Sequence, residues 1–246
     1  MARESGSRAP SEARGSGGRA PSGLFISFEG PDGGGKTTQA ALLVERLRVE
    51  GRDAVAIHEP GGTDLGSDVR ALLVRRGWTP IEPRAEALLF SACRAQLVAE
   101  VIRPSLARGA IVVADRFADS TLAYQGAGRG LPIEELSSLI QIATDGLEPD
   151  LTLLLDVPSE VGLDRLAGGG KAPPDGGAVQ VSLFEEFRMA AGWNRFEDEA
   201  LSFHQRVRDA YLRMAEAKPG RWRVIDATQP VEQVARAVID QVQGRR

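Results

Sequence analysis

One short stretch constrains this chain more than any other. The apolar segment Ile26 to Glu29 runs directly into Gly-Pro-Asp-Gly-Gly-Gly-Lys-Thr-Thr at residues 30–38, and a helical pattern follows. Glycines at this spacing let the backbone curl so that successive N–H groups cradle phosphate oxygens, while the helix directs its positive N-terminal dipole at the same anion. Strand, glycine-rich turn and helix in this order form a P-loop. The sequence therefore predicts a site for a nucleoside triphosphate.

The residue types inside this loop assign a task to several positions. Lys36 adds a mobile positive charge beside the phosphates, and it is one of only three lysines in a chain with 27 arginines. The hydroxyl of Thr37 has the chemistry to ligate Mg²⁺. A glycine-rich turn that merely precedes a helix is the alternative interpretation. The predicted phosphate cradle comprises Gly30, Asp32, Gly33, Gly34, Gly35, Lys36, Thr37 and Thr38.

The composition limits the partners that the chain can have. A formal net charge of −4 argues against general nucleic-acid binding, because phosphate-backbone affinity comes from an excess of Lys and Arg. The single cysteine, Cys93, leaves no internal disulfide and no cysteine cluster, which is typical of a reducing compartment such as the cytoplasm. No apolar stretch is long enough to cross a membrane. We therefore expect small-molecule partners in the cytoplasm.

The N-terminal residues 1–22 differ in composition from the rest of the chain. They consist mainly of Arg, Gly, Ser, Ala, Pro and Glu and lack the apolar core of a secretory signal. Such a composition predicts a disordered tail. An organellar transit peptide is the alternative, but the glycines, the prolines, Glu4 and Glu12 oppose the amphipathic helix that it needs.

Five short apolar segments alternate with helical patterns along residues 23–246. Two of them, at 110–115 and 151–156, end in Asp after an apolar run, which is typical of strands buried on both faces. Strands that alternate with helices form parallel sheets with helices on both sides. We predict one three-layer α/β domain of the P-loop NTPase type with a five-stranded parallel sheet. Its strands are expected at 26–29, 53–58, 110–115, 151–156 and 222–226, and its helices at 38–50, 65–76, 82–108, 133–145, 159–166, 194–217 and 231–242.

One segment of this domain interrupts the alternation. Residues 168–177, Gly-Gly-Gly-Lys-Ala-Pro-Pro-Asp-Gly-Gly, suit neither helix nor strand. They open an irregular excursion that runs to about Trp193, with room for a short helix at 183–190. Over the carboxyl edge of an α/β sheet such an excursion could serve as a lid, which we assign to residues 166–195. A plain surface insertion is the alternative.

Six motifs follow one another in order between Leu24 and Val242. They are FEGPDGGGKTT from Phe28, EPGGT from Glu59, LLFSACRAQ from Leu88, DRF from Asp115, STLAYQ from Ser120 and PDLTLLLD from Pro149. The set closely resembles the bacterial thymidylate kinase family. The resemblance implies that the γ-phosphoryl group of ATP is transferred to dTMP with Mg²⁺, a step of dTTP synthesis. It also implies an enzyme that is usually a homodimer.

The resemblance assigns the catalytic charges to particular residues. Asp115, at the end of a predicted strand, would face the P-loop and hold Mg²⁺ through water, with Thr37 as the second metal-binding residue. Arg116 would grip the acceptor phosphate as a bidentate fork. Arg70 matches a family arginine near the same phosphate. For Asp115 and Arg116 the alternative is a pair that only caps a strand. For Arg70 the alternative is an ordinary exposed residue of a helix.

The base pocket is predicted from a second group of residues. Phe90 and Arg94 are four residues apart on one predicted helix, so they share a face on which ring and guanidinium can clamp a nucleobase. In the family the residues at these positions stack on thymine and hydrogen-bond its edge. The alternative for Phe90 is an ordinary position in the hydrophobic core. The other positions assigned to the substrate are Asp32, at the 3′-hydroxyl, Glu59 of the EPGGT motif, and Thr121, Tyr124 and Gln125 around thymine and sugar.

The glycine at position 33 indicates which part of the chain would supply one further catalytic cation. Thymidylate kinases with Gly instead of a basic residue here resemble the class that supplies its transition-state arginine from the lid. Arg195 is our first choice for this phosphate-facing charge, with Lys171 and Arg188 behind it. Arg165 is in register with an arginine of that class. A surface arginine without a catalytic role is the alternative for Arg195.

Two other functions stay open on the sequence. A related P-loop kinase would act on a different small acceptor. A nucleotide-dependent switch or partitioning ATPase would use the same loop to order a partner-binding surface. Against the ATPase, Pro31 and Asp32 stand where partitioning ATPases carry a signature lysine. No Asn-Lys-x-Asp guanine motif is present, which argues against a GTPase.

Overall fold

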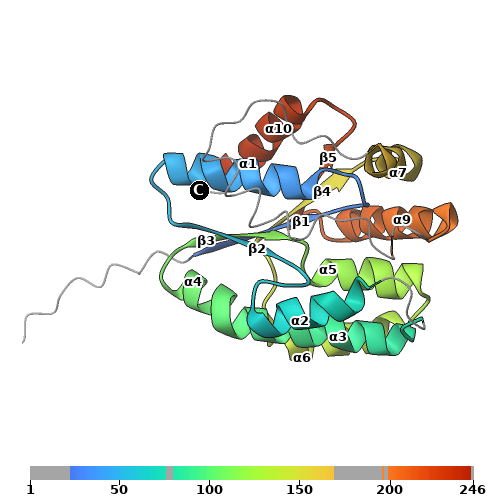
Figure 1. The fold of residues 1–246 in the computed structure, drawn as a ribbon. Helices are drawn as coiled ribbons and strands as arrows, with labels where there is room; N and C mark the ends of the chain where they lie inside the picture. Colours follow the sequence, from blue (N-terminus) through green and yellow to red (C-terminus); the bar gives the residue numbers. More distant parts are fainter. Residues whose placement is uncertain (1–22, 76–79, 169–195, 197–198, 245–246) are drawn as a thin grey trace, which may run out of the picture.

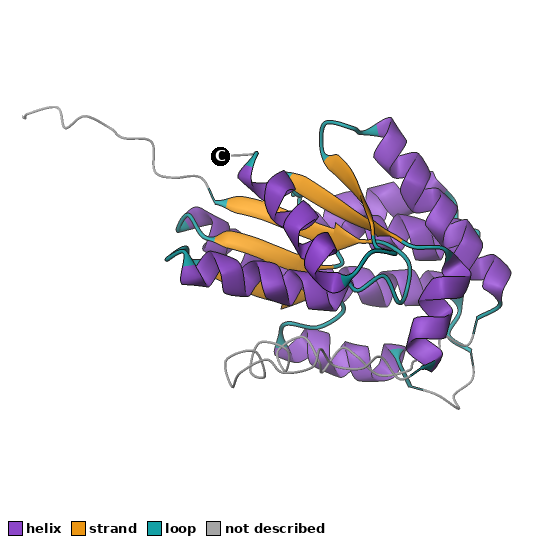
Figure 2. Cartoon of the chain, turned by 90° about the horizontal axis from the view of Figure 1, so that it is seen from above, coloured by secondary structure: helices purple, strands orange, loops and turns teal. Residues whose placement is uncertain are grey.

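A parallel sheet forms the centre of the computed structural model, which describes residues 23–75, 80–168, 196 and 199–244. The sheet has five strands in the order β2-β3-β1-β4-β5, and each neighbouring pair is parallel. Figure 2 shows these strands side by side with helices packed along them. The predicted sheet is thereby confirmed. Its strands are β1 (Leu24–Glu29), β2 (Ala54–His58), β3 (Ile111–Asp115), β4 (Leu151–Asp156) and β5 (Trp222–Asp226).

Helices lie on both sides of this sheet, which gives the predicted three layers (Figure 1). On one side, α1 (Lys36–Val49) and α10 (Val231–Gln243) pack against each other and against the strands. Among the described residues no helix is both long and apolar enough to cross a membrane. The helices on the other side are α2 (Asp64–Leu73), α3 (Pro83–Leu97), α4 (Arg103–Ala107), α5 (Ala118–Thr121), α6 (Ile133–Thr144) and α9 (Leu201–Ala217), and α7 (Ser159–Ala167) packs beside α9.

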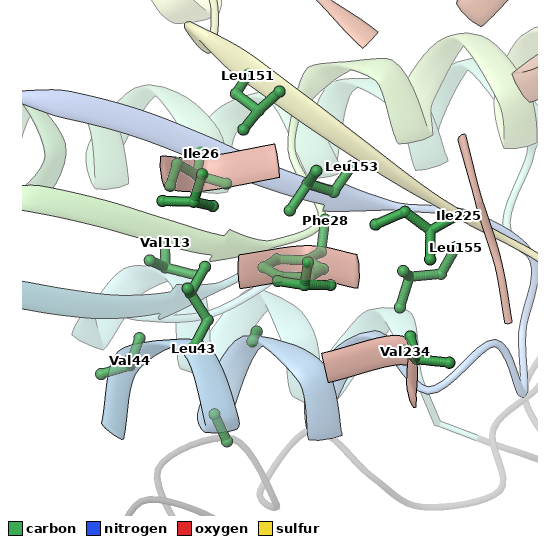
Figure 3. Close-up of a cluster of buried hydrophobic side chains, with 14 of the residues drawn as sticks. Ile26, Phe28, Leu43, Val44, Val113, Leu151, Leu153, Leu155, Ile225 and Val234 are labelled. Carbon is green, nitrogen blue, oxygen red and sulfur yellow. The ribbon is translucent and has the colours of Figure 1, made fainter. Parts of the chain in front are cut away.

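Apolar side chains from alternate strand positions form a separate core on each face of the sheet. Phe28 and Val113 extend toward Leu43 of α1, as Figure 3 shows. The intervening residues, such as Phe25 and Val112, belong to the cluster on the opposite face. Successive strand residues point to opposite faces, so a strand buried on both sides needs a continuous apolar run. This requirement explains why the apolar strand segments were recognisable in the sequence.

The strand order places the sequence motifs at one edge of the sheet. β1 leads into the P-loop at its carboxyl end, and β3 lies beside it with Phe28 opposite Asp115. The backbone N–H of Arg116 donates to the carbonyl oxygen of Phe28 at 3.0 Å. The residues that follow β3 therefore lie next to the phosphate loop, at the edge where open α/β sheets bind their ligands.

Two helical regions differ from the prediction. The expected helix 82–108 is continuous but contains a π-helical segment, η1 (Val98–Ile102), between α3 and α4. Residues 118–128, for which no element was expected, form α5 and the π-helical segment η2 (Leu122–Gly128). A π-helical turn leaves little trace in apolar periodicity because it inserts a residue into the helix without changing the residue types around it.

The region before α9 also differs from the prediction. The expected helix 194–217 begins at Leu201, because Ala200 has an extended backbone and its carbonyl oxygen accepts from the N–H of Phe203. The assigned lid, 166–195, begins within α7, which continues to Ala167. Residues 169–195, which hold most of the assigned lid, and the predicted tail 1–22 lie outside the described residues.

Candidate nucleotide-binding site

A cavity of about 960 Å³ opens at the carboxyl edge of the sheet. It brings together nearly all of the site residues predicted from the sequence, although they come from separate segments of the chain. Gly30 contributes carbonyl contacts to the site without lining the cavity, and Arg195 lies outside the described residues. The predicted residues that line the cavity are Asp32, Gly33, Gly34, Gly35, Lys36, Thr37, Thr38, Glu59, Arg70, Phe90, Arg94, Asp115, Arg116, Thr121, Tyr124 and Gln125.

The phosphate loop packs closely against the first turns of α7. Gly33 has a φ of 74°, in the left-handed region that favours glycine. A Cβ atom on Gly33 would lie 2.0 Å from the carbonyl oxygen of Gly162, and one on Gly162 would lie 2.2 Å from the carbonyl oxygen of Asp32. Neither position accepts a side chain without displacing backbone. The basic residue that some relatives carry at the position of Gly33 therefore does not fit this loop.

Lys36 is held inside the loop that it follows. Its Nζ donates to the carbonyl oxygens of Gly30 and Pro31 at 3.0 and 2.7 Å, and the side chain is buried. Burial and the nearby positive charge of Arg116 lower the pKa of Lys36 to about 8. These weak carbonyl partners leave the ammonium available for a stronger anionic one.

Thr37 and Asp115 meet across the space between α1 and β3. The Thr37 hydroxyl donates to a carboxylate oxygen of Asp115 at 2.5 Å. A hydroxyl and a carboxylate oxygen at the mouth of a phosphate loop are the ligand types that Mg²⁺ prefers. The two residues therefore fit the metal-binding task that the sequence predicts for them.

Arg116 is the most heavily coordinated cation of the cavity. Its Nη2 donates to the Asp32 carboxylate at 2.5 Å and to the Tyr124 hydroxyl at 2.9 Å. Its backbone has a φ of 72°, a conformation that is strained for a residue with a side chain and is often found at functional sites. Burial alone would lower the pKa of Arg116, but Tyr124 and Asp32 outweigh it, so the group stays charged.

A buried carboxylate, Glu29, organises the space behind Arg116. It accepts from the Phe117 N–H at 2.8 Å, the Ser120 hydroxyl at 2.6 Å and the Tyr211 hydroxyl at 2.9 Å. Tyr211 in turn accepts from Nη1 of Arg116 at 3.3 Å. Burial, with a contribution from nearby Asp119, raises the pKa of Glu29 to about 7.

Arg94, which lines the cavity, has one buried guanidinium nitrogen without a partner among the described residues. Its side chain is only 1% exposed, and its other nitrogens bind the Glu59 carboxylate at 2.9 and 2.7 Å and the carbonyl oxygen of Phe117 at 3.3 Å. Within the described part of the chain, Nη1 has no hydrogen-bond partner. A buried guanidinium N–H calls for an acceptor, so a ligand carbonyl oxygen at this position would satisfy it. Glu59 fixes the direction in which the guanidinium points.

Aromatic side chains form the wall beside Arg94. The ring of Phe90 lies 6.0 Å from that of Phe196, and the ring of Tyr124 lies 6.1 Å from it. Phe90 is partly buried against two apolar clusters and also lines the cavity, so its position is compatible with a core role and with contact to a base. The buried hydroxyl of Thr121 has no partner within the described residues. An apolar slot with a few directed polar groups suits a flat heterocycle.

The remaining candidate cations differ in what they contact. Nη1 of Arg70 donates to the carbonyl oxygen of Pro60 at 3.0 Å, at the edge of the cavity. Nη1 of Arg165 donates to the carbonyl oxygens of Gly33 and Ala227 at 3.4 and 2.9 Å, so this residue ties α7 to the phosphate loop. Lys171, Arg188 and Arg195 lie outside the described residues.

The sequence prediction missed several residues that support the site. Tyr211 lies at helical spacing from Phe203 and Val207, a pattern typical of a core position. Glu29 lies inside a recognised motif, but nothing local indicates which donors surround it. The contact between Gly33 and Gly162 joins two segments that are far apart in sequence. The only sequence signal for Tyr211 is rarity, because the chain has just two tyrosines and both contact Arg116.

Comparisons with known proteins agree with this geometry. The thymidylate kinase family model matches residues 28–238. The thymidylate kinase of Thermomicrobium roseum is 50% identical over 87% of this chain and 91% of its own length, and that of Desulfovibrio desulfuricans is 49% identical over 86% and 91%. The crystal structure of thymidylate kinase from Ehrlichia chaffeensis superposes with a TM-score of 0.67 at 32% identity, covering 91% of this chain and 99% of that one. The chain therefore belongs to the thymidylate kinase family.

Proposed function

We propose that this protein is a dTMP kinase, which transfers the γ-phosphoryl group of ATP to dTMP and releases dTDP and ADP. One observation carries the proposal. A single cavity is lined by the phosphate loop, by Arg116, which contacts that loop, and by Arg94 and Phe90. A triphosphate in the loop and a monophosphate on Arg116 would therefore meet within one cavity.

The charges of the cavity suit the transfer of a phosphoryl group between two nucleotides. The second pKa of a phosphate monoester is about 6, so the attacking oxygen of dTMP is ionised at neutral pH and requires no general base. The main obstacle is repulsion between two polyanions. Lys36 would bind the triphosphate and Arg116 the acceptor phosphate, which positions the reacting groups and offsets their charge. Mg²⁺, held by Thr37 and Asp115, would add further positive charge at the transferring group.

Arg116 has to share its guanidinium with the acceptor phosphate. Asp32 and Tyr124 occupy Nη2, while Nη1 makes longer contacts of 3.2 and 3.3 Å to the Gly30 carbonyl oxygen and the Tyr211 hydroxyl. A phosphate is a stronger acceptor than either of these partners of Nη1. Asp32 would then stay beside the sugar, in keeping with its predicted contact to the 3′-hydroxyl. Arg70 would add charge from the β2 side of the cavity.

A panel of nucleoside monophosphates tests the activity. Purified protein with ATP and Mg²⁺ should form ADP fastest with dTMP among dTMP, dUMP, CMP and AMP. Equal or slower turnover of dTMP would show that a different small acceptor is the substrate. ATP hydrolysis that does not depend on any monophosphate would point instead to a switch ATPase. Omission of Mg²⁺ with excess chelator should abolish turnover, which tests the metal assignment.

We also propose a homodimer that forms through α2, α3 and α6. These helices lie side by side in Figure 1, and they expose Leu72, Leu88 and Ile142, of which Ile142 is 79% exposed. Apolar side chains gathered on one face are typical of a protein interface. Light scattering should give twice the chain mass, and Leu88→Glu should lower it. Val49→Glu, a change at an exposed apolar residue of α1, is the matched control and should leave the mass unchanged.

The remaining parts of the prediction stay proposals. We propose one catalytic domain over residues 23–246, with Arg195 as the additional phosphate-facing cation. Arg195→Ala should lower kcat with ATP and dTMP at saturation, whereas Arg188→Ala should have a smaller effect. Equal kinetics for Arg195→Ala and the wild type would remove Arg195 from the catalytic set.

A further inference from the structure

Another buried carboxylate, Glu86, lies behind the base pocket. It is on α3, its side chain is 0% exposed, and the sequence prediction gives it no role. Oε1 of Glu86 accepts from Nε2 of Gln125 at 2.7 Å. The guanidinium of Arg129 approaches the same carboxylate at 3.4 and 3.5 Å. Gln125 itself lines the cavity, so Glu86 contacts a side chain that faces the ligand space.

The chemistry of this contact fixes the orientation of the Gln125 amide. A carboxylate that binds a guanidinium only accepts hydrogen bonds, whereas an amide has a donor end and an acceptor end. The donor end of Gln125 must therefore face Glu86, because two acceptors in contact would repel each other. The carbonyl oxygen of the amide is then the end left for the cavity. An isolated glutamine has no such preference and could rotate by half a turn.

The two polar groups of the pocket then form a defined pattern. Nη1 of Arg94 can only donate, and Oε1 of Gln125 can only accept. Thymine and uracil present adjacent complementary groups, the C4 carbonyl oxygen and the N3–H. Cytosine presents the opposite pair, a C4 amino group and an unprotonated N3. A site whose buried polar groups are left unpaired by the wrong ligand discriminates strongly against it.

We propose that Glu86 is a positioning residue that sets base specificity, because it holds Gln125 in the orientation that accepts the N3–H of thymine or uracil and rejects cytosine. The proposal rests on the dTMP kinase function proposed above. It concerns the hydrogen-bonding edge of the base and makes no claim about the 5-methyl group.

Glu86→Gln tests the proposal, because the amide introduced at this position can donate or accept and no longer dictates how Gln125 turns. The matched ligands are dTMP, dUMP, which keeps the N3–H and C4 oxygen, and 5-methyl-dCMP, which keeps the methyl group and reverses the edge. The readouts are kcat/KM for dTMP and dUMP and the inhibition constant of 5-methyl-dCMP against dTMP. The preference for dTMP over 5-methyl-dCMP should fall at least about fivefold, while the dTMP to dUMP ratio should change by less than about twofold.

Two further variants separate specificity from folding. Glu199→Gln removes the same charge from the other carboxylate bound to Arg129, at 2.5 Å, and should leave both ratios unchanged. Glu86→Asp retains a carboxylate and should retain the preference for dTMP even where its melting temperature falls. Should Glu86→Gln not fold, Gln125→Met serves instead. It removes the accepting oxygen, so it should lower kcat/KM for dTMP and dUMP alike and should reduce the discrimination against 5-methyl-dCMP.

The outcomes distinguish this inference from the proposed function. A wild-type enzyme that does not phosphorylate dTMP overturns the function, and the inference with it. A wild-type enzyme that works, combined with a Glu86→Gln variant in which both ratios move together or neither moves, overturns the inference alone. Retained discrimination in Gln125→Met overturns it as well. A selective gain of 5-methyl-dCMP binding in Glu86→Gln supports it.

Discussion

The phosphate loop and the base pocket share one cavity but are built in different ways. The loop is a single stretch, residues 30–38, whose glycines Gly30, Gly33 and Gly35 have positive φ values, and its backbone N–H groups are the candidate phosphate donors. The pocket draws its side chains from the end of β2, from α3, from the turn after β3 and from η2. In the pocket the directed polar groups depend on buried partners from elsewhere, such as Glu59 for Arg94 and Glu86 for Gln125.

This difference separates affinity for phosphate from recognition of a particular nucleotide. Every residue other than proline carries a backbone N–H, so a short glycine-rich segment suffices to bind an anion. A base is distinguished by the direction of individual donors and acceptors, and long side chains lose that direction unless a partner holds them. The buried carboxylates provide those partners here. Changes to the loop should therefore affect the use of ATP, and changes to the pocket should affect the use of dTMP.

The largest expected effects come from removing either of two cations, Lys36 for the triphosphate or Arg116 for the acceptor phosphate. Lys36→Ala and Arg116→Ala should each lower kcat/KM by a factor of about a hundred or more, which corresponds to about 2.7 kcal/mol of transition-state stabilisation. Lys36→Ala should raise KM for ATP and leave KM for dTMP nearly unchanged, and Arg116→Ala should do the reverse. Steady-state kinetics with one substrate varied at a time measures the split. Near-wild-type kinetics for either variant would contradict the assigned roles.

A smaller effect is expected where only the partner of a pocket residue is changed. Glu59→Gln should lower kcat/KM for dTMP by about tenfold, because Arg94 loses the carboxylate that orients it, and should leave KM for ATP unchanged. It should also lower the free energy of unfolding by about 2 kcal/mol, because a buried guanidinium loses its charged partner. Chemical denaturation measures the second quantity.

The control for Glu59→Gln is an exposed ion pair of the same type. Asp53 and Arg108 are 2.9 Å apart, with side chains 57% and 49% exposed. Asp53→Asn should change the free energy of unfolding by less than about 1 kcal/mol and leave both kcat/KM values unchanged, because water screens the pair. Equal losses in the two variants would show that burial of the Glu59 partner has no special role.

The pH dependence of ATP use should expose the state of Lys36. Its pKa of about 8 is below the ordinary value for lysine, so the ammonium loses its proton as pH rises through 8. We expect kcat/KM for ATP, which reports the free enzyme, to fall about tenfold per unit above pH 8. Lys36→Arg should move this alkaline limb to higher pH, because arginine stays protonated. A flat profile to pH 10 in the wild type would contradict the lowered pKa.

The smallest expected effect concerns Tyr211, which supports Arg116 from α9. Tyr211→Phe removes one hydrogen bond to Nη1 of Arg116 and one to Glu29, but Asp32 and Tyr124 still hold Nη2. We expect KM for dTMP to rise about three- to tenfold, with KM for ATP unchanged. An equal rise in both values would show that the effect is transmitted through the fold as a whole and that binding of ATP and binding of dTMP are less independent than proposed.

The prediction of the fold from the sequence succeeded where the sequence pattern depends only on neighbouring residues. The phosphate loop is one contiguous motif, and strands such as β3 and β4 are apolar runs that end in a carboxylate. Both features can be recognised without knowing what lies next to them. It was wrong about the start of α9 and expected no element at residues 118–128. In these two regions the local residue types do not determine whether the backbone is extended or helical.

The sequence by itself determined the phosphate loop, the parallel sheet and a set of candidate side chains that line the cavity. The tertiary structure decided how those side chains are held. Arg94 meets Glu59 across 35 residues of sequence, and Arg116 meets Asp32 across 84. Backbone geometry depends on neighbouring residues, whereas the orientation of a buried charge depends on every group that surrounds it after folding. The identities of Glu29, Glu86 and Tyr211 as supporting residues therefore became visible only once the chain was folded.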